Sequence, residues 1–261
     1  MPEQHIPPEP LADSPQRLRV LTVNIHKGFT FFNRRFMLPE LREAIRQVGA
    51  DIVFLQEVTG EHQQHAMRLT EWPKTSHYEF LADTIWTAHA YGRNAVYPDG
   101  HHGNAVLSKF PIVSFENHDI SVGRHEARGL LHCVVRPQPD GPDLHLLCVH
   151  LGLLESHRQK QLGRLCEFMS THLPPDEPVI LAGDFNDWRL RADEVLRRCG
   201  AREIHHGNHA RPARTFPARW PLLRLDRIYV KNVRHCKPVP LAAQPWSRLS
   251  DHVPIAAEVS A

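Results

Sequence analysis

Eight short apolar runs, each typical of a β-strand, recur along residues 19–259 and are bounded by glycine, proline, asparagine or aspartate. They lie at 19–25, 51–58, 103–110, 129–136, 144–151, 178–184, 225–231 and 253–259. The turn-rich segment PQPDGPD at 137–143 joins two of them and predicts an antiparallel hairpin. Helices are predicted at 39–48, 155–172 and 191–199 from apolar periodicity. The expected fold class is α/β (α+β): mostly antiparallel sheets with helices on their outer faces.

The composition is that of a globular protein, with 41% hydrophobic and 23% charged residues in a chain of 261. A formal net charge of +2 excludes a protein that coats nucleic acid through bulk charge. Residues 1–17 hold five of the 22 prolines and are expected to form a flexible N-terminal segment. Because 18–261 contains no repeat and no strong linker, we expect it to form a single domain.

The sequence also bears on the compartment. No apolar run reaches the roughly 18 residues of a membrane span, and the N-terminus lacks the basic start and apolar stretch of a secretory signal. The five cysteines form an odd set without CxxC spacing, so we expect neither a disulfide framework nor structural zinc. These features favour a reducing compartment and hence a cytoplasmic location.

Polar side chains follow the predicted strands where a core-building sequence needs only turn residues. They are Asn24, Gln56 and Glu57, His150, Asp184 and Asn186 in the run GDFND, Asp226 inside LDRIYV, and Ser250-Asp251-His252. Taken singly, each is explained by turn chemistry or by a structural hydrogen bond. Strand ends at one rim of a sheet converge in space, however, so we expect the set to share a pocket.

This combination of side chains suits cleavage of a phosphate ester. Glu57 and Asp251, with Asn24 or Asn186, offer the oxygen ligands that a hard divalent cation prefers. Asp184 in a tight turn suits the activation of water, and His252 and His150 suit the stabilisation of the phosphate. Asp226, a carboxylate between apolar neighbours in a strand, needs a partner, and His252 is the natural one.

The ordered motifs resemble the endonuclease/exonuclease/phosphatase superfamily over residues 19–259. The blocks are LTVNIHKG, DIVFLQEV, GNAVLS, CVHL, GDFND, LDRIYV and SDH, in the family's order. The resemblance implies a four-layered α/β sandwich and a metal-dependent hydrolase using Mg²⁺ or Mn²⁺. It implies metal binding by Glu57, Asn24 and Asp251, and catalysis by the following five residues: Asp184, His252, His150, Asp226 and Asn186. Arg128 in EARG matches a recurrent family arginine, and we predict that Arg128, Asn104 and Arg224 bind substrate.

One difference from the abasic-site nucleases of this superfamily narrows the range of activities expected for this chain. The abasic-site nucleases carry a metal-linked aspartate two residues after the first-block asparagine, where this chain has His26. Segments such as NIHKGF and HHGNAVLS resemble instead a small bacterial subgroup often encoded near cardiolipin synthase. We therefore expect a phosphate-ester substrate that is phospholipid-derived or a small phosphodiester. Two alternatives stay open: a DNA or RNA nuclease, and a non-catalytic protein that binds a phosphorylated ligand. No obligate protein partner is evident.

Two segments are candidates for contact with the substrate. GFTFFNRRF at 28–36 interleaves phenylalanines with arginines, a pattern that suits stacking on bases, peripheral membrane contact or packing beneath a helix. The arginine-rich segment 211–227 leads into Asp226 and suits either phosphate binding or support of the sheet. His101 and His102 are expected to line a pocket wall. Of the 20 histidines, only His150 and His252 are assigned to the chemistry; apart from His26, we expect the other seventeen to be surface or packing residues.

Overall fold

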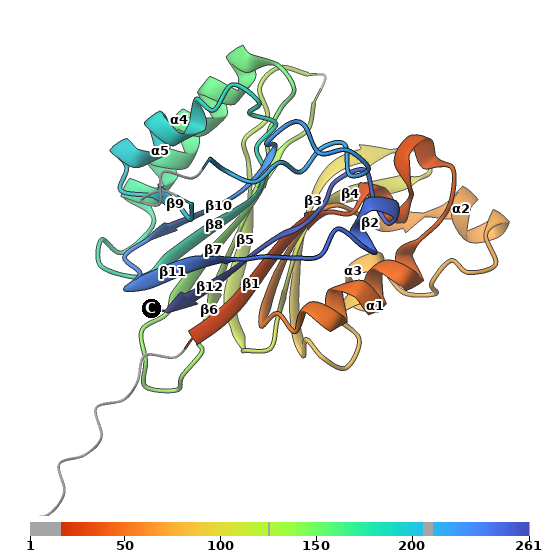
Figure 1. The fold of residues 1–261 in the computed structure, drawn as a ribbon, viewed down its shortest axis with the longest axis horizontal. Coiled ribbons are helices and arrows are strands. Elements are labelled where there is room, and N and C mark those ends of the chain that lie inside the picture. The colour runs from red at the N-terminus through yellow and green to blue at the C-terminus, as the bar shows by residue number, and fades with distance from the viewer. Residues whose placement is uncertain (1–16, 125, 206–210, 261) are drawn as a thin grey trace, which may run out of the picture.

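The structure, a computed structural model, describes residues 17–124, 126–205 and 211–260. The predicted flexible segment 1–17 lies outside the described residues except for Arg17, which begins the first strand. Twelve strands in this part of the chain form two six-stranded sheets. Five α-helices cover the outer faces, which gives the expected four layers (Figure 1).

The first sheet has the strand order β11-β12-β1-β2-β4-β3. Its strands are β11 (His235–Val239), β12 (Ile255–Ser260), β1 (Arg17–Asn24), β2 (Ile52–His62), β4 (Gly100–Ser108) and β3 (Ala88–Tyr97). β1 and β2 run parallel, whereas the other neighbours are antiparallel. The helices α1 (Leu38–Val48), α2 (Gln63–Arg68) and α3 (His77–Ala82) lie on this sheet's side of the molecule.

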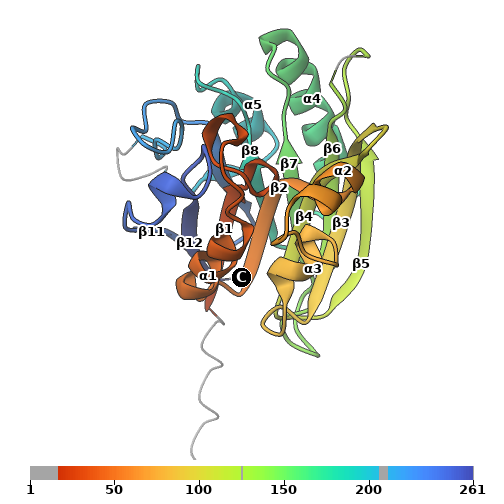
Figure 2. The same ribbon diagram turned by 90° about the vertical axis from the view of Figure 1, so that its right-hand side faces the viewer.

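The second sheet has the order β5-β6-β7-β8-β10-β9. Its strands are β5 (Ile112–Asp119), β6 (Gly129–Val135), β7 (Leu144–His150), β8 (Val179–Asp184), β10 (Asp226–Lys231) and β9 (Arg202–Glu203). β7 and β8 are parallel, and the predicted 137–143 hairpin is confirmed by the antiparallel pairing of β6 with β7. α4 (Glu155–Thr171) and α5 (Ala192–Arg198) lie on its outer side, as the turned view in Figure 2 also shows.

The core has three parts because each sheet buries both faces. Side chains such as Val20, Phe54, Leu146 and Ile228 fill the space between the sheets. Alternate residues on the same strands face outward and pack against the helices. Burial on both faces explains why these strands read as continuous apolar runs rather than as alternating ones.

All eight predicted strands and three predicted helices are present. The structure adds the following elements, which no clear sequence pattern predicts: β3, β5, β9, β11, α2, α3 and the short 3₁₀ turns His26–Gly28, Phe31–Asn33 and Trp246–Arg248. None of the described helices has both the length and the apolar character of a membrane span.

One expectation about the cysteines is wrong. Cys166 in α4 and Cys199 at the end of α5 form a disulfide across the two packed helices. The pairing depends on how these helices meet, which the cysteine spacing does not reveal. Cys133, Cys148 and Cys236 are free thiols, and the first two are buried between the sheets.

The packing between the sheets makes a prediction for stability. Leu146 is fully buried there, so Leu146→Ala should lower the free energy of unfolding by about 2–5 kcal/mol, because it leaves a cavity. Val96→Ala, at an exposed site, should change it by less than about 0.5 kcal/mol. Urea denaturation of the three proteins measures both values, and equal losses for the two variants would contradict the assignment of the core.

Candidate active site

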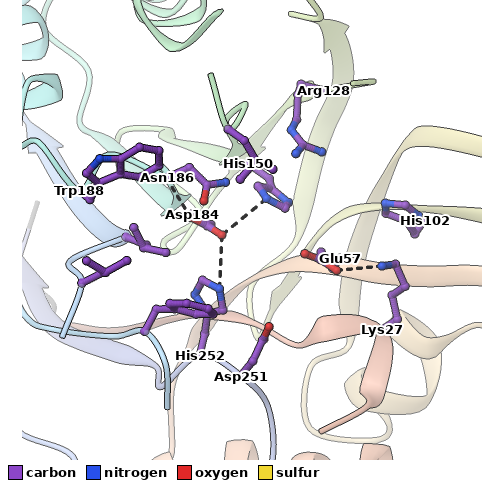
Figure 3. Close-up of a pocket in the computed structure, with 14 residues that line it drawn as sticks. Lys27, Glu57, His102, Arg128, His150, Asp184, Asn186, Trp188, Asp251 and His252 are labelled. Atoms are coloured by element: carbon purple, nitrogen blue, oxygen red, sulfur yellow. Dashed lines mark hydrogen bonds and ion pairs between the residues drawn. The ribbon is translucent and has the colours of Figure 1, made fainter. Parts of the chain in front are cut away.

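The predicted polar side chains meet where the two sheets open at one end. β1, β7 and β8 end at Asn24, His150 and Asp184, and β10, antiparallel to β8, begins at Asp226. The register places His150 and Asp226 on either side of Asp184. A cavity of about 440 Å³ opens here (Figure 3). Its lining consists of Lys27, Glu57, His102, Arg128, His150, Leu153, Asp184, Asn186, Trp188, Phe216, Leu223, Leu225, Asp251 and His252.

Asp184 is the centre of the hydrogen-bonding network in this cavity. Its Oδ2 accepts a hydrogen bond from Asn24 Nδ2 at 3.1 Å and lies 3.5 Å from His150 Nε2 and 3.7 Å from His252 Nε2. Its Oδ1 accepts from the backbone N–H of Asn186 at 2.9 Å. Figure 3 shows the two imidazoles reaching this carboxylate from different sides. The carboxylate is therefore fixed in orientation by three chain segments.

A glycine allows β8 to bring Asp184 to this position. A Cβ at Gly183 would lie 1.9 Å from the carbonyl oxygen of Val149, and the residue has a φ of 149°. Only glycine adopts this backbone at such close approach without displacement. The sequence Gly183-Asp184 therefore lets β7 and β8 present His150 and Asp184 side by side.

His252 and Asp226 form a buried pair behind the cavity. His252 Nδ1 donates to Asp226 Oδ2 at 2.8 Å, which is the pairing predicted from the sequence. Burial opposes charging of the imidazole, but Asp226 and Asp184 offset it and raise the pKa of His252 to about 10. His252 is therefore an imidazolium at neutral pH, with its Nε2–H side toward Asp184 and the cavity.

His150 has the opposite protonation state. Burial and, next, the guanidinium of Arg128 lower the pKa of His150 to about 4, although Asp184 and Glu57 act in the other direction. The imidazole is neutral at neutral pH. One carboxylate is thus flanked by a charged histidine and a neutral one, so the cavity holds a fixed cation and a neutral hydrogen-bonding group.

Glu57 reaches the cavity through a β-bulge in β2. The strand register shifts between Leu55 and Val58, and Glu57 has a left-handed φ of 54°. A bulge re-aims a side chain within a strand. Its Oε2 pairs with Lys27 Nζ at 3.1 Å, and Oε1 accepts from Asn24 Nδ2 at 3.3 Å. Burial opposes its ionisation, but His150, Lys27 and His26 hold the pKa of Glu57 well below its usual range.

Asp251 lies opposite Glu57 on the loop before β12. Its Oδ2 is 3.7 Å from His26 Nδ1, and its Oδ1 accepts from Ser250 Oγ at 3.3 Å. The same Ser250 hydroxyl lies 2.8 Å from the carbonyl oxygen of Asn24. Burial raises the pKa of Asp251, and the negative charge of Glu57 raises it further. His252 and His26 act in the opposite direction. A bound cation would relieve the repulsion between these two carboxylates.

The donor chemistry fits a hard divalent cation. Glu57 and Asp251 supply carboxylate oxygens that face the cavity, and that of Glu57 pairs with Lys27. The Asn24 amide, as oriented here, donates to Glu57 and Asp184, which makes it a support for the ligands. A second group within ligand reach, Asp184 with Asp226 and His252, is less suited, because a protonated His252 cannot bind a metal.

Two of the predicted substrate-binding residues lie elsewhere. The Asn104 amide donates to the carbonyl oxygens of Gly129 and Cys148, at 3.0 Å and 3.3 Å, and so holds three strands together. Arg224 Nε donates to the Pro212 carbonyl at 2.7 Å within its own segment. Neither is among the described residues that line the cavity. Arg128 does line it, and its Nε has no hydrogen-bond partner in the described part of the chain.

Sequence reasoning missed several residues of the cavity. Lys27, two residues beyond the predicted strand 19–25, reaches Glu57 because His26 and Lys27 both have left-handed backbones. Trp188 and Phe216 line the cavity from loops whose course the sequence did not reveal. Trp188 directly follows the GDFND motif, and Phe216 lies within the arginine-rich segment 211–227 that was predicted as a candidate for substrate contact.

The chain belongs to the Endonuclease/Exonuclease/phosphatase family, whose family model matches residues 21–252. This family acts hydrolytically on phosphoester bonds and is generally dependent on divalent metals. The family predicted from the order of the motifs is thereby confirmed.

Among curated proteins, the chain is 59% identical over 242 residues to "Uncharacterized protein YbhP" of Escherichia coli K12, covering 92% of this chain and 95% of that one. The protein of the same name from Shigella flexneri matches to the same extent. These names state no substrate, and the relation to cardiolipin synthase stays a prediction.

Among solved structures, an endonuclease/exonuclease/phosphatase from Beutenbergia cavernae superposes with a TM-score of 0.75 at 19% identity, over 94% of this chain and 71% of that one. Danio rerio TDP2 complexed with single strand DNA product superposes with a TM-score of 0.65 at 20% identity, over 94% and 99% of the two chains. At these identities the likeness shows the shared fold alone.

The Asp226–His252 pair makes a prediction for pH dependence. The pKa of His252 rises on folding from 6.5 to about 10, so the pair stabilises the fold fully below pH 6.5 and loses its effect as the pH rises toward 10. The difference in unfolding free energy between the wild type and Asp226→Asn should therefore shrink across this interval. Urea denaturation at a series of pH values measures it.

The control for this experiment is Asp143→Asn, which breaks an exposed pair with Arg136. Its effect should be constant over the same interval, because both partners stay charged throughout. A flat difference for Asp226→Asn as well, together with an imidazole signal of His252 that titrates near pH 6.5 by NMR, would contradict the raised pKa.

Proposed function

We propose that this protein is a divalent-metal-dependent hydrolase of phosphodiesters or phosphomonoesters that uses water as the nucleophile. The observation that carries the proposal is the position of Asp184 between a charged His252 and a neutral His150, beside the carboxylates of Glu57 and Asp251. Such a cavity offers a carboxylate base, a positively charged imidazolium and carboxylate oxygens for a metal ion within one hydrogen-bonded network.

Each residue has a role that its contacts support. Asp184, oriented by Asn24 and the Asn186 N–H, accepts a proton from the attacking water while the water oxygen bonds to phosphorus. The imidazolium of His252 stabilises negative charge on the phosphate, and Asp226 holds its tautomer. The bond from phosphorus to the leaving oxygen breaks, and that oxygen takes up a proton.

Three further residues complete the phosphate site. His150, neutral, and Arg128, with its unpartnered Nε, offer hydrogen-bond donors from the second sheet. Asn186 is held by its own bond to the Leu151 carbonyl at 3.0 Å, which fixes its position beside the cavity. We propose that these three contact the substrate's phosphate oxygens.

Glu57 and Asp251, supported by Asn24, would hold Mg²⁺ or Mn²⁺. When bound, the cation supplies charge neutralisation for the phosphate and for the leaving oxygen. Lys27, which pairs with Glu57 here, would be free to turn toward the anionic substrate once that carboxylate binds the cation.

We propose that the substrate is a phospholipid-derived or another small phosphodiester. A DNA or RNA nuclease is the second candidate, because TDP2, of similar fold, has been crystallised with a single strand DNA product. The cytoplasmic location stays a prediction from the sequence. The Cys166–Cys199 disulfide counts against it, because disulfides are rare in the cytosol.

The assignment of Asp184 and His252 is tested by hydrolysis of an activated phosphodiester, bis(p-nitrophenyl) phosphate, with Mg²⁺. Asp184→Asn and His252→Gln should each lower kcat by about 10²- to 10⁴-fold, because each removes a group that acts on the reacting atoms. Met67→Ser, at an exposed site away from the cavity, should match the wild type, and EDTA should abolish turnover.

The same panel separates the alternatives. Oligonucleotides and phospholipid-derived diesters replace the activated substrate in parallel assays. Equal rates in the wild type, Asp184→Asn and His252→Gln would exclude the proposed roles. Metal-independent binding of a phosphorylated ligand with no turnover of any substrate would favour the non-catalytic interpretation.

Binding of the metal ion can be measured separately from turnover. Glu57→Gln removes one carboxylate charge, so it should weaken binding of Mn²⁺ by at least about tenfold. Isothermal titration calorimetry or Mn²⁺ electron paramagnetic resonance measures this without turnover. Glu61→Gln, further along β2, is the matched control and should bind as the wild type does. An unchanged affinity in Glu57→Gln would place the metal elsewhere.

A further inference from the structure

Large apolar side chains are exposed mainly around the mouth of the cavity. Of the twelve exposed ones in the described part of the chain, eight lie in four segments: 29–36, 151–154, 188–192 and 211–224. These eight are Phe31, Phe32, Leu153, Leu154, Trp188, Trp220, Leu222 and Leu223. We call the four segments together the rim. A concentration of exposed apolar surface beside a cavity is typical of an interaction site rather than of ordinary protein surface.

The rim borders two cavities that share a wall. Leu153, Trp188 and Leu223 line the cavity of the candidate active site. Phe31 and Trp220 line a neighbouring cavity of about 880 Å³. Asp251 lines both, so a single mouth region leads to the proposed metal ligands from either side. Trp188 is labelled at the edge of the first cavity in Figure 3.

Two rim segments are short hairpin-like loops that project their tips. In 29–36, an isolated bridge joins Phe29 to Phe36, and Phe29 packs in the core while Phe32 is 69% exposed. In 211–224, a bridge joins Phe216 to Leu223, and the loop between them carries Trp220, 70% exposed. The rings of Phe31 and Phe216 lie 6.4 Å apart, so the two loops are neighbours. Their bases are fixed and their apolar tips face outward.

The rim is strongly cationic, although the chain as a whole is nearly neutral. Its four segments contain eight arginines and no aspartate or glutamate, and two of these arginines, Arg35 and Arg191, pair with Glu40 and Glu155 just outside the rim. The Arg34 guanidinium lies 5.6 Å from the ring centre of Phe32, and that of Arg219 lies 5.1 Å from the ring centre of Trp220. Positive charge is thus held at the level of the exposed aromatic tips, an arrangement that suits an anionic surface with an apolar interior.

We propose that the rim is a docking surface for an anionic lipid bilayer. Aromatic and aliphatic side chains at its loop tips enter the boundary between headgroups and acyl chains, and the arginines pair with headgroup phosphates. The mouth of the cavity then faces the lipid headgroups. Docking stands on the rim alone; only the consequence that headgroup phosphodiesters reach Asp184 rests on the proposed function.

Two other occupants fit the rim less well. Four of its eight exposed apolar residues are leucines, which offer a nucleic-acid base no ring to stack on and its phosphate no donor. A second copy of the chain docked by the same face would place arginine against arginine, because a two-fold interface pairs a patch with itself. A bilayer accepts leucine, tryptophan and arginine together.

The test is co-sedimentation of the full chain with vesicles, in EDTA so that turnover plays no part. One set contains phosphatidylcholine alone and the other phosphatidylcholine with phosphatidylglycerol. We expect binding to the anionic set that falls with added salt. Phe32→Ser/Leu222→Ser should weaken it at least about tenfold, because two exposed apolar tips are lost. Arg34→Gln/Arg219→Gln should weaken it by about tenfold on anionic vesicles only.

The matched control is Met67→Ser/Val96→Ser, which removes two equally exposed apolar side chains outside the rim and should bind as the wild type does. Phe32→Ser/Leu222→Ser should keep the wild-type rate on a soluble phosphodiester, which separates docking from catalysis. Vesicle binding that no rim variant weakens would overturn the proposal. So would absence of vesicle binding, whether accompanied by rim-dependent binding of a single-stranded oligonucleotide or by rim-dependent dimerisation in sedimentation.

Discussion

Two buried carboxylates lie directly opposite each other on neighbouring strands, and the site depends on the positive charge that offsets their repulsion. Asp184 in β8 and Asp226 in β10 are register partners, exposed by only 1% and 0%. Like charges in such positions destabilise a sheet, and burial in a medium of low polarity increases the cost. The imidazolium of His252 offsets it, because it is 2.8 Å from one carboxylate and 3.7 Å from the other.

This requirement connects the two sheets. His252 belongs to the loop that enters β12 of the first sheet, whereas both carboxylates lie on the second. The loop is held against the end of β1 by the contact of Ser250 Oγ with the Asn24 carbonyl, and against segment 211–224 by the donation of the Ala218 N–H to the Asp251 carbonyl. Asn24 in turn donates to Asp184 across the sheets. A single network thus sets the separation of the sheets at this end and the cavity between them.

Much of this arrangement could be predicted from the sequence, because the strands are buried on both faces and read as apolar runs. The polar residues that interrupt such runs, Asp226 above all, needed partners, and the order of the motifs indicated which strand ends converge. The strands that were missed are polar or exposed. β5 is an exposed edge strand and β11 contains Pro238, so neither has the pattern of a buried strand.

What the sequence could not reveal depends on backbone conformation and on packing at a distance. Lys27 meets Glu57 through left-handed residues on one side and a bulge on the other, and neither has a reliable sequence signature. Asn104 lies in one of the family's motifs, but its amide joins strands through the carbonyl oxygens of Gly129 and Cys148. Only the three-dimensional structure shows this role. The disulfide depends likewise on how α4 and α5 pack.

The histidines illustrate the same limit. Beyond His150 and His252, several are neither surface residues nor ligands. His77 is buried beside Trp72, and burial lowers the pKa of His77 to about 3. His145 bonds His132 at 2.9 Å on the outer face of the second sheet. These imidazoles serve as packing or hydrogen-bonding groups, a role that their number in the sequence does not distinguish from metal binding.

The topology also explains why the site and the rim occur together. Strands that end at one edge of two sheets must be continued by loops at that edge. The chain that follows β1 beyond Asn24 therefore includes segment 29–36, and the chain that leads into β10 at Asp226 includes segment 211–224. A core-building chain gains nothing by placing phenylalanine, tryptophan and leucine on such tips, since exposed apolar loops favour aggregation. Their bases are nevertheless fixed by bridges, and Arg34 and Arg219 lie beside the exposed rings of Phe32 and Trp220 at their tips. Exposure at these positions is therefore built into the fold, and the surface that it forms borders the cavity lined by Glu57, Asp184 and His252.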